Sequence, residues 1–183
     1  TITLEETETP GSCPQEIGIV QTWTATDACG NSTTVSRTIW VEDTTDPIFA
    51  NIPEEVSVEC DATLPTDAPT ATDNCDESVT ITLEETETPG SCPQEIGIVQ
   101  TWTATDACGN SSTVSRTIWV EDTTDPIFAN IPEEVSVECD ATLPTDAPTA
   151  TDNCDESVTI TLEETETPGS CPQEIGIVQT WTA

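Results

Sequence analysis

The most constraining feature of this sequence is a repeat of 79 residues, because copies of one segment are expected to fold in the same way. Residues 1–79 and 80–158 differ at a single position, Thr33 against Ser112, and residues 159–183 begin a third copy. Two separately selected binding sites would be expected to leave more differences. The repeat therefore indicates a recent duplication whose effect is to lengthen the protein.

Both ends of the chain fall inside a repeat, so we expect it to be an excerpt of a longer protein. It contains no start methionine, no secretory signal pattern and no apolar run long enough to span a bilayer. The phase of the turns places one complete domain at 43–121, between the end of one repeat at 1–42 and the beginning of another at 122–183. A domain this small lies below the ~100–150 residues typical of a compact core, so crosslinks or a metal are expected to support it.

Alternation of apolar and polar residues predicts strands and no helix. The segments VSVEC (56–60) and SVTITLE (78–84) each place their apolar side chains on one face. Residues 96–105 and 112–120 are rich in β-branched and aromatic residues and are separated by the turn sequence DACGNS. They are predicted to form a hairpin.

Stretches rich in Pro, Gly, Asp and Asn, at 61–74 and 86–95, are predicted to be connecting loops. Short, closely spaced strands joined by turns favour an all-β sandwich. The predicted fold is therefore all-β, with Ig-like β-sandwich modules in an end-to-end array. Trp102 is expected in the core of the central module, whereas Trp119 has the opposite alternation phase to Ile118 and its environment is left open.

The frame DTTDPIF, VSVECDA, ATDNCD, SCP, TWTATDACGN and TIWVED resembles the HYR-like (hyalin-repeat-like, immunoglobulin-related) modules with four cysteines. Such modules are repeated in tandem in very large cell-surface proteins of Bacteroidota, including gliding-motility and adhesion proteins. The resemblance covers the whole repeat and implies Ig-like sandwiches in an extracellular adhesin or filament. Many relatives carry DTTPP or DTTAP where this chain has DTTDP, so Asp46 adds a carboxylate at the junction of two repeats.

The chain has nine cysteines but neither a Cys-x-x-Cys pair nor a histidine that would build a zinc or redox centre. In a small, loop-rich extracellular domain, cysteines are expected to form disulfides. The expected disulfide residues are Cys13, Cys29, Cys60, Cys75, Cys92, Cys108, Cys139, Cys154 and Cys171.

The pairing within one repeat has three alternatives. Cys92 and Cys108 flank the strand 96–105, which spans ~30 Å at about 3.3 Å per residue, far beyond the ~7 Å limit on the Cα separation in a disulfide. A Cys60–Cys75 bridge across the Pro-rich loop is the first expectation, and Cys60–Cys108 is the second. The partner of Cys92 is left open between its own domain and the neighbouring repeat.

The formal charge of −34 comes from 36 acidic residues against two basic ones, Arg37 and Arg116. Such a surface repels nucleic acid and anionic membranes and attracts cations. Carboxylate doublets such as Glu54 and Glu55 lie on edges and loops of a module too small to enclose a cleft, and no His or Lys supplies a base. We therefore predict no enzymatic activity.

Acidic residues are densest where two repeats are expected to meet, because the linker VEDTTDP and the turns TATDNCD and TATDACGN of the following repeat converge there. Ca²⁺ accepts about six to eight oxygen ligands in flexible geometry, and extracellular modules bind it with a Kd of ~10⁻⁴–10⁻³ M. The alternative is that these acids cap turns or are solvated. The predicted Ca²⁺ ligands are Glu42, Asp43, Asp46, Asp73, Asp76, Asp106, Glu121, Asp122, Asp125, Asp152 and Asp155, with Glu8 or Glu16 of the preceding repeat as a further candidate.

Two kinds of glycosylation site are candidates. Asn31 and Asn110 begin N-glycosylation triplets, although turn geometry alone explains an Asn in the DACGNS turn. Thr44 and Thr123 lie in Asp-Thr-Thr triplets that resemble the acceptors of Bacteroidota O-glycosylation.

Together these features predict a non-enzymatic extracellular stalk of a large bacterial adhesin, in which the repeats hold a binding tip away from the cell. Its partners are the neighbouring repeats of the same chain; no segment is expected to insert into a membrane. The alternative is a self-assembling filament or sheath, in which other copies bury more than ~1,000 Å² per interface.

Overall fold

The computed structural model of the chain describes residues 1–170 and 172–183, and all of its regular elements are strands. No helix that could span a membrane occurs among these residues. The strands are β1 (Ile2–Pro10), β2 (Ile17–Thr26), β3 (Ser32–Val41), β4 (Ile48–Ala50), β5 (Val56–Glu59), β6 (Thr70–Thr72), β7 (Thr80–Pro89), β8 (Ile96–Thr105), β9 (Ser111–Glu121), β10 (Ile127–Ala129), β11 (Thr149–Thr151), β12 (Thr161–Pro168) and β13 (Ile175–Thr182).

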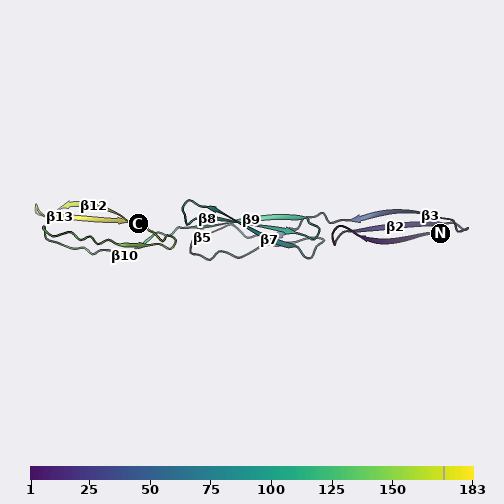
Figure 1. Cartoon of the computed structure of the whole chain (residues 1–183), viewed down its shortest axis with the longest axis horizontal. Coiled ribbons are helices and arrows are strands. Elements are labelled where there is room, and N and C mark those ends of the chain that lie inside the picture. Colours follow the sequence, from purple (N-terminus) through teal and green to yellow (C-terminus); the bar gives the residue numbers. More distant parts are fainter. Residues whose placement is uncertain (171) are drawn as a thin grey trace. The chain divides into compact units, whose positions relative to one another are not determined.

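The strands form several separate sheets (Figure 1). A four-stranded sheet has the order β5-β9-β8-β7, a three-stranded sheet has the order β1-β2-β3, and β4-β6, β10-β11 and β12-β13 are pairs. The predicted all-β class is confirmed, and the arrangement is consistent with an Ig-like sandwich. The predicted hairpin is also confirmed, since β8 and β9 are neighbours in their sheet.

Two segments predicted to be loops contain strands. Residues 70–72 form β6, which pairs antiparallel with β4 so that Phe49 lies opposite Ala71. Strand β7 continues through Thr88 to Pro89 before the chain turns. Threonine favours extended backbone because it is β-branched, and proline is tolerated at the end of an edge strand. The loop prediction gave too much weight to the prolines and too little to the threonines.

Residue contacts divide the chain into two compact units. Unit 1 comprises Thr1–Val56, Pro65–Thr88 and Ile98–Ile118, and unit 2 comprises Ser57–Leu64, Pro89–Gly97 and Trp119–Ala183. Each unit thus contains residues from successive repeats. The domain boundaries expected from the sequence stay a prediction.

The core of unit 1 is built from alternate residues of β8 and from β9. Ile98, Trp102 and Ala104 of β8 are buried, and Ile118 of β9 is fully buried. The predicted core position of Trp102 is therefore confirmed. Trp119 is 39% exposed, which follows from its opposite phase to Ile118 on β9.

Arg116 of β9 is buried at the edge of this core, beside Trp102, whose ring centroid lies 5.6 Å from the guanidinium carbon. Its Nε donates a hydrogen bond to Oε1 of Gln100 at 2.7 Å, and its Nη1 donates to both carboxylate oxygens of Asp67 at 3.0 Å. Its Nη2 donates to the carbonyl of Pro65 at 3.4 Å. Arg116 therefore fastens the Pro-rich loop onto the sheet.

We predict that Arg116→Lys lowers the free energy of unfolding by about 1–3 kcal/mol, because an ammonium group replaces neither the planar fork nor its stacking on Trp102. Urea unfolding of the oxidised chain measures this change. Arg37→Lys is the matched control, because Arg37 is exposed and donates to Gln21 in the same sequence context. Equal effects of the two substitutions would contradict a special role for the buried arginine.

Candidate functional site

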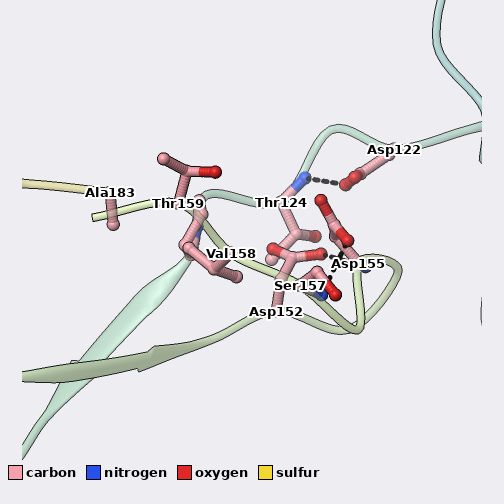
Figure 2. Close-up of a pocket in the computed structure, with 9 residues that line it drawn as sticks. Asp122, Thr124, Asp152, Asp155, Ser157, Val158, Thr159 and Ala183 are labelled. Atoms are coloured by element: carbon pink, nitrogen blue, oxygen red, sulfur yellow. Dashed lines mark hydrogen bonds between the residues drawn. The ribbon is translucent and has the colours of Figure 1, made fainter. Parts of the chain in front are cut away.

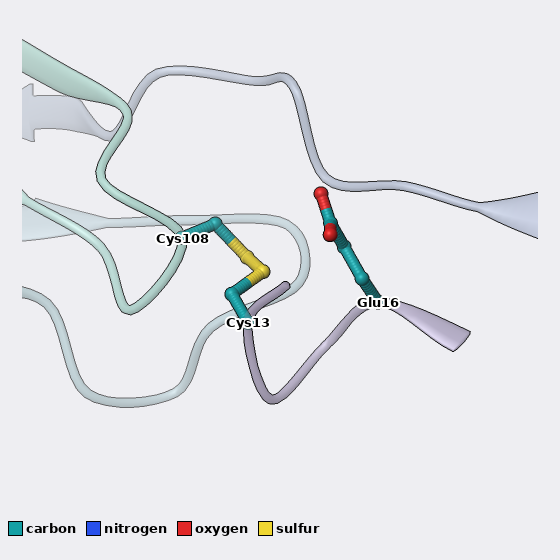
Figure 3. A group of neighbouring side chains, drawn as sticks. All are labelled: Cys13, Glu16 and Cys108. Carbon is teal, nitrogen blue, oxygen red and sulfur yellow. A yellow bond between two sulfur atoms is a disulfide. The ribbon is translucent and has the colours of Figure 1, made fainter. Parts of the chain in front are cut away.

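The described part of the chain contains two disulfides, and each joins cysteines of successive repeats. Cys13, in the turn after β1, pairs with Cys108, in the turn after β8, with a Cα separation of 4.9 Å (Figure 3). Cys60, which follows β5, pairs with Cys154, which follows β11, with a Cα separation of 5.8 Å. Both separations lie in the usual range for a disulfide.

The expected Cys60–Cys75 bridge is wrong for this structure. Cys60 pairs instead with Cys154, the residue equivalent to Cys75 in the following repeat. Cys60 belongs to unit 2 and Cys75 to unit 1. The expected Cys60–Cys75 bridge required the loop between these two cysteines to bring both thiols to the same end of the domain. In the structure, however, β5 delivers Cys60 to the linker that follows the repeat, where Glu59 accepts a hydrogen bond from the backbone N–H of Thr123 at 3.3 Å.

The second expectation, Cys60–Cys108, is also wrong, since Cys108 pairs with Cys13. Cys92 and Cys108, the pair least expected from the sequence, are not bonded to each other. Cys92 has no disulfide partner among the described residues, but its equivalent in the first repeat is Cys13, which bonds to the neighbouring repeat. The free cysteines among the described residues are Cys29, Cys75, Cys92 and Cys139, and Cys171 lies outside the described residues.

The linker before β4 carries a buried carboxylate next to a second one. Asp43 is 4% exposed, and its Oδ1 accepts a hydrogen bond from the backbone N–H of Thr45 at 3.2 Å. Asp73 accepts bonds from the backbone N–H groups of Cys75 and Asp76 through its own Oδ1. The Oδ2 atoms of Asp43 and Asp73 are buried with no hydrogen-bond partner. One ligand atom from each of Asp43, Asp73 and Cys75 lies within 4.8 Å of the others.

The turn between β8 and β9 closes over this pair. Nδ2 of Asn110 donates to the carbonyl of Asp43 at 3.1 Å, and the backbone N–H of Ala107 donates to Oδ2 of Asp76 at 2.7 Å. Asp106 caps its own turn, since its two oxygens accept bonds from the backbone and side chain of Asn110 and from the backbone N–H of Cys108. Asp73 and Asp106, which the alternative to metal binding expected to cap turns, both accept turn hydrogen bonds, and Asp76 does so as well. Metal binding by these residues stays a prediction.

The third repeat presents the same carboxylates in unit 2. Asp122, Asp152 and Asp155 line a cavity of about 310 Å³, and Figure 2 shows their carboxyl groups gathered on one side of it. The Oδ2 of Asp152 is again buried without a hydrogen-bond partner. Glu59 lies beside Asp122, because one carboxylate oxygen of each lies within 4.8 Å of the other, next to the bridged sulfur of Cys154.

Several predicted ligands lie outside these groups. Glu42, Asp46 and Asp125 are exposed, and Asp46 accepts a hydrogen bond from the backbone N–H of Ser111 at 3.2 Å. Glu121 is half-buried. Glu16 lies beside the Cys13–Cys108 bridge instead (Figure 3), where hydrogen bonds from the side chain and backbone of Ser12 hold the pKa of its carboxyl below its usual range.

Glu59 and Thr123 are neighbours at the joint that the sequence pattern did not predict. Thr123 donates to Glu59 through both its hydroxyl and its backbone N–H. Glu59 precedes Cys60 in the sequence, so a bridge from Cys60 to the following repeat would have indicated that Glu59 lies at that joint.

Charge around the free thiol of Cys75 acts against its ionisation. Partial desolvation, then the negative charges of Asp43 and Asp73, raise the pKa of Cys75. A thiol with a raised pKa is mostly protonated at neutral pH and attacks disulfides slowly. The same carboxylates therefore restrain the reactivity of Cys75.

The candidate glycosylation positions differ in their surroundings. Nδ2 of Asn110 donates to Asp43 and Asp106, and Nδ2 of Asn31 donates to Asp27 at 2.8 Å. Turn geometry is thus the observed role of both asparagines. Thr44 is exposed, whereas the Thr123 hydroxyl is bonded to Glu59. Glycosylation of these residues stays a prediction.

Comparison with known families agrees with the four cysteines of the repeat. Residues 48–120 match the family described as HYR-like domain with 4 cysteines. This HYR-like match contains Cys60, Cys75, Cys92 and Cys108. No curated protein matches the sequence. The HYR-like domain is a non-catalytic, adhesion-type domain.

The turn cap of Asp106 predicts a pH-dependent stability. Burial of Asp106 opposes its ionisation, but hydrogen bonds from Asn110, Gly109 and Cys108 outweigh burial and hold the pKa below its ordinary value. A depressed folded-state pKa stabilises the fold above the unfolded value of about 3.9 and loses that contribution as pH falls through the folded value.

Asp106→Asn should therefore lower the melting temperature at pH 7, and the deficit should shrink as pH falls below the unfolded pKa of about 3.9 and the folded carboxyl of Asp106 becomes protonated. Differential scanning calorimetry across this range measures the difference. Asp27→Asn should show the same pH dependence, because hydrogen bonds from Asn31 and Cys29 hold the pKa of Asp27 below its ordinary value in the equivalent turn. A deficit for Asp106→Asn that is constant with pH would contradict the charged cap.

Proposed function

We propose that this chain is a segment of an extracellular, non-enzymatic stalk in which tandem repeats hold the binding tip of a large bacterial adhesin away from the cell. The observation that carries the proposal is the pair of bridges between successive repeats, Cys13–Cys108 and Cys60–Cys154. A binding domain needs no covalent bond to its neighbour, whereas a stalk under tension gains from one. Each bridge provides a load path in addition to the linker.

An extracellular location is supported by the HYR-like match at residues 48–120 and by the disulfides. Disulfides form and persist in oxidising compartments and are rare in the reducing cytosol. The chain has 36 acidic and two basic residues. The resulting negative charge makes the surfaces of neighbouring chains repel each other, which disfavours lateral association.

Calcium is the second part of the proposal. Buried carboxylate oxygens without partners, on Asp43, Asp73 and Asp152, are costly to desolvate unless a cation or donor satisfies them. Calcium suits carboxylate oxygens and completes its shell with water. In unit 2, Asp122 comes from the third repeat and its neighbour Glu59 from the central one, so an ion bound to both would connect two repeats and stiffen their junction.

The calcium proposal predicts a rise in melting temperature when Ca²⁺ is added to the oxidised chain and a return to the starting value with EGTA. At Ca²⁺ tenfold above Kd, each site adds about 1.4 kcal/mol to the free energy of unfolding. Calorimetric titration should give a Kd of ~10⁻⁴–10⁻³ M.

The variants Asp73→Asn and Asp152→Asn should each lose part of this response, because each removes a buried carboxylate charge from one site. Glu54→Gln, which removes an exposed charge outside both groups, should keep the full response. No heat of binding and no shift in melting temperature would assign these carboxylates to turn capping and surface charge alone.

The stalk proposal also predicts that a fragment with several complete repeats is monomeric and appears as separate beaded rods in electron micrographs. Sedimentation velocity should give one species whose frictional ratio increases with the number of repeats. Ordered polymers, with more than ~1,000 Å² buried per interface, would replace the stalk with the filament or sheath.

A further inference from the structure

Each free cysteine of the described chain is the repeat equivalent of a cysteine that forms a bridge. The 79-residue period relates Cys92 to the bridged Cys13, Cys75 to Cys154, Cys29 to Cys108 and Cys139 to Cys60. The same sequence position is therefore free in one repeat and bonded to a neighbouring repeat in another. If the free cysteines can form the same bond, their turns should have the same backbone conformation as those of the bridged cysteines.

The turn around Cys92 matches the turn around Cys13. The backbone N–H of Gly90 donates to the carbonyl of Glu95 at 2.8 Å, and the N–H of Gly11 donates to Glu16 at the same distance. The carbonyl of Cys92 accepts from Glu95 at 3.1 Å, and that of Cys13 accepts from Glu16 at 3.0 Å. The free thiol thus lies in the same backbone conformation as the bridged one.

The aspartate-capped turns give the same result. The backbone N–H groups of Cys75 and Cys154 each donate at 2.8 Å to the Oδ1 of the aspartate two residues earlier. Those of Cys29 and Cys108 do so at 2.8 and 2.9 Å.

Cys60 and Cys139 also lie in matching turns. The N–H of Ala62 donates to Glu59 at 3.0 Å, and that of Ala141 donates to Glu138 at 2.9 Å. None of the four free cysteines needs a different turn to form the bond that its equivalent makes.

We propose that every joint between successive repeats is closed by two disulfides, one of the Cys13–Cys108 kind and one of the Cys60–Cys154 kind. Cys92 and Cys139 then bond to the repeat that follows theirs, and Cys29 and Cys75 bond to the repeat that precedes theirs. The partner is in each case another copy of this repeat. This inference deepens the proposed function and rests on its end-to-end connection of repeats.

The chemistry is the oxidation of two thiols to one disulfide. Each new bridge releases two protons and two electrons, and an organic disulfide accepts them and is reduced to two thiols. Oxidised glutathione serves as this oxidant in vitro. With two bridges and one peptide linker, each joint has three covalent connections, so a cut in the linker leaves the repeats attached.

The central and third repeats allow a direct test, because Cys60–Cys154 already joins them and Cys92 is predicted to add the second bridge. Two chains are compared after oxidative folding, both with a specific protease site inserted between Thr124 and Asp125. One is the 183-residue chain. The other continues the repeated sequence past Ala183 to the equivalent of Glu121, and so gains the equivalent of Cys108.

After cleavage, the fragments are separated on denaturing gels without reductant. Cys60→Ser should release the fragments in the 183-residue chain, which then has no bridge across the cut. The same substitution in the longer chain should leave them joined, because Cys92 now has its partner. Adding Cys92→Ser should release them, and adding Cys29→Ser as the matched control should not. Release by Cys60→Ser alone in the longer chain would overturn the inference.

A thiol count tests the same point without any cysteine substitution. The 183-residue chain has nine cysteines. The bridges Cys13–Cys108 and Cys60–Cys154 use four of them, which leaves four thiols for alkylation among the described residues. The longer chain adds one cysteine, and mass spectrometry should show the alkylated thiols falling by one. A rise by one would show that the added cysteine stays free and would contradict the second bridge.

The outcomes separate this inference from the stalk. Separate rods together with released fragments would reject the second bridge and keep the stalk. Ordered polymers together with joined fragments would reject the stalk and keep the two bridges.

Discussion

The bonding of each repeat to the next through cysteines is the constraint on which the rest of this structure depends. A repeat of 79 residues is small for an independent core, and only a few side chains of β8 and β9 are fully buried. In a protein with internal staples, the disulfides would support each domain separately. Here Cys13–Cys108 and Cys60–Cys154 act between repeats, so the stability of one repeat is linked to the presence of its neighbours.

The acidic composition is compatible with this arrangement because many carboxylates have specific backbone donors. Asp73, Asp106 and Asp152 cap turns, and these turns carry the cysteines. The carboxylates therefore position the thiols as well as solvating the surface. The guanidinium of Arg116 binds Asp67 inside the central repeat. It is therefore not available to neutralise Asp43 and Asp122 at the joints, which favours an external cation there.

Much of the fold followed from local sequence patterns. The β-branched and aromatic residues of 96–105 and 112–120, with the turn between them, predict the β8–β9 hairpin and the burial of Trp102, because these signals lie in neighbouring residues. The density of acids in the linker predicted that Asp43 lies near Asp73, and one carboxylate oxygen of each lies within 4.8 Å of the other. Pairing of Cys60 could not be predicted in the same way, because it depends on which end of the domain each loop reaches. That end is set by the strand order β5-β9-β8-β7, which is a property of the whole sheet.

In a chain of near-identical repeats, each cysteine has several identical candidate partners in other repeats. Every copy offers the same thiols in the same turns, so local structure does not distinguish an adjacent repeat from a distant one. The linker makes the distinction, because a short tether gives adjacent thiols an effective concentration of about millimolar or more. This tether is also held in place. Pro47 is fully buried, and its carbonyl accepts a hydrogen bond from Ser112 at 2.6 Å, while Asn110 binds the carbonyl of Asp43. A linker packed against the following repeat restricts the positions that the preceding repeat can reach, and this restriction selects the correct partner from identical candidates.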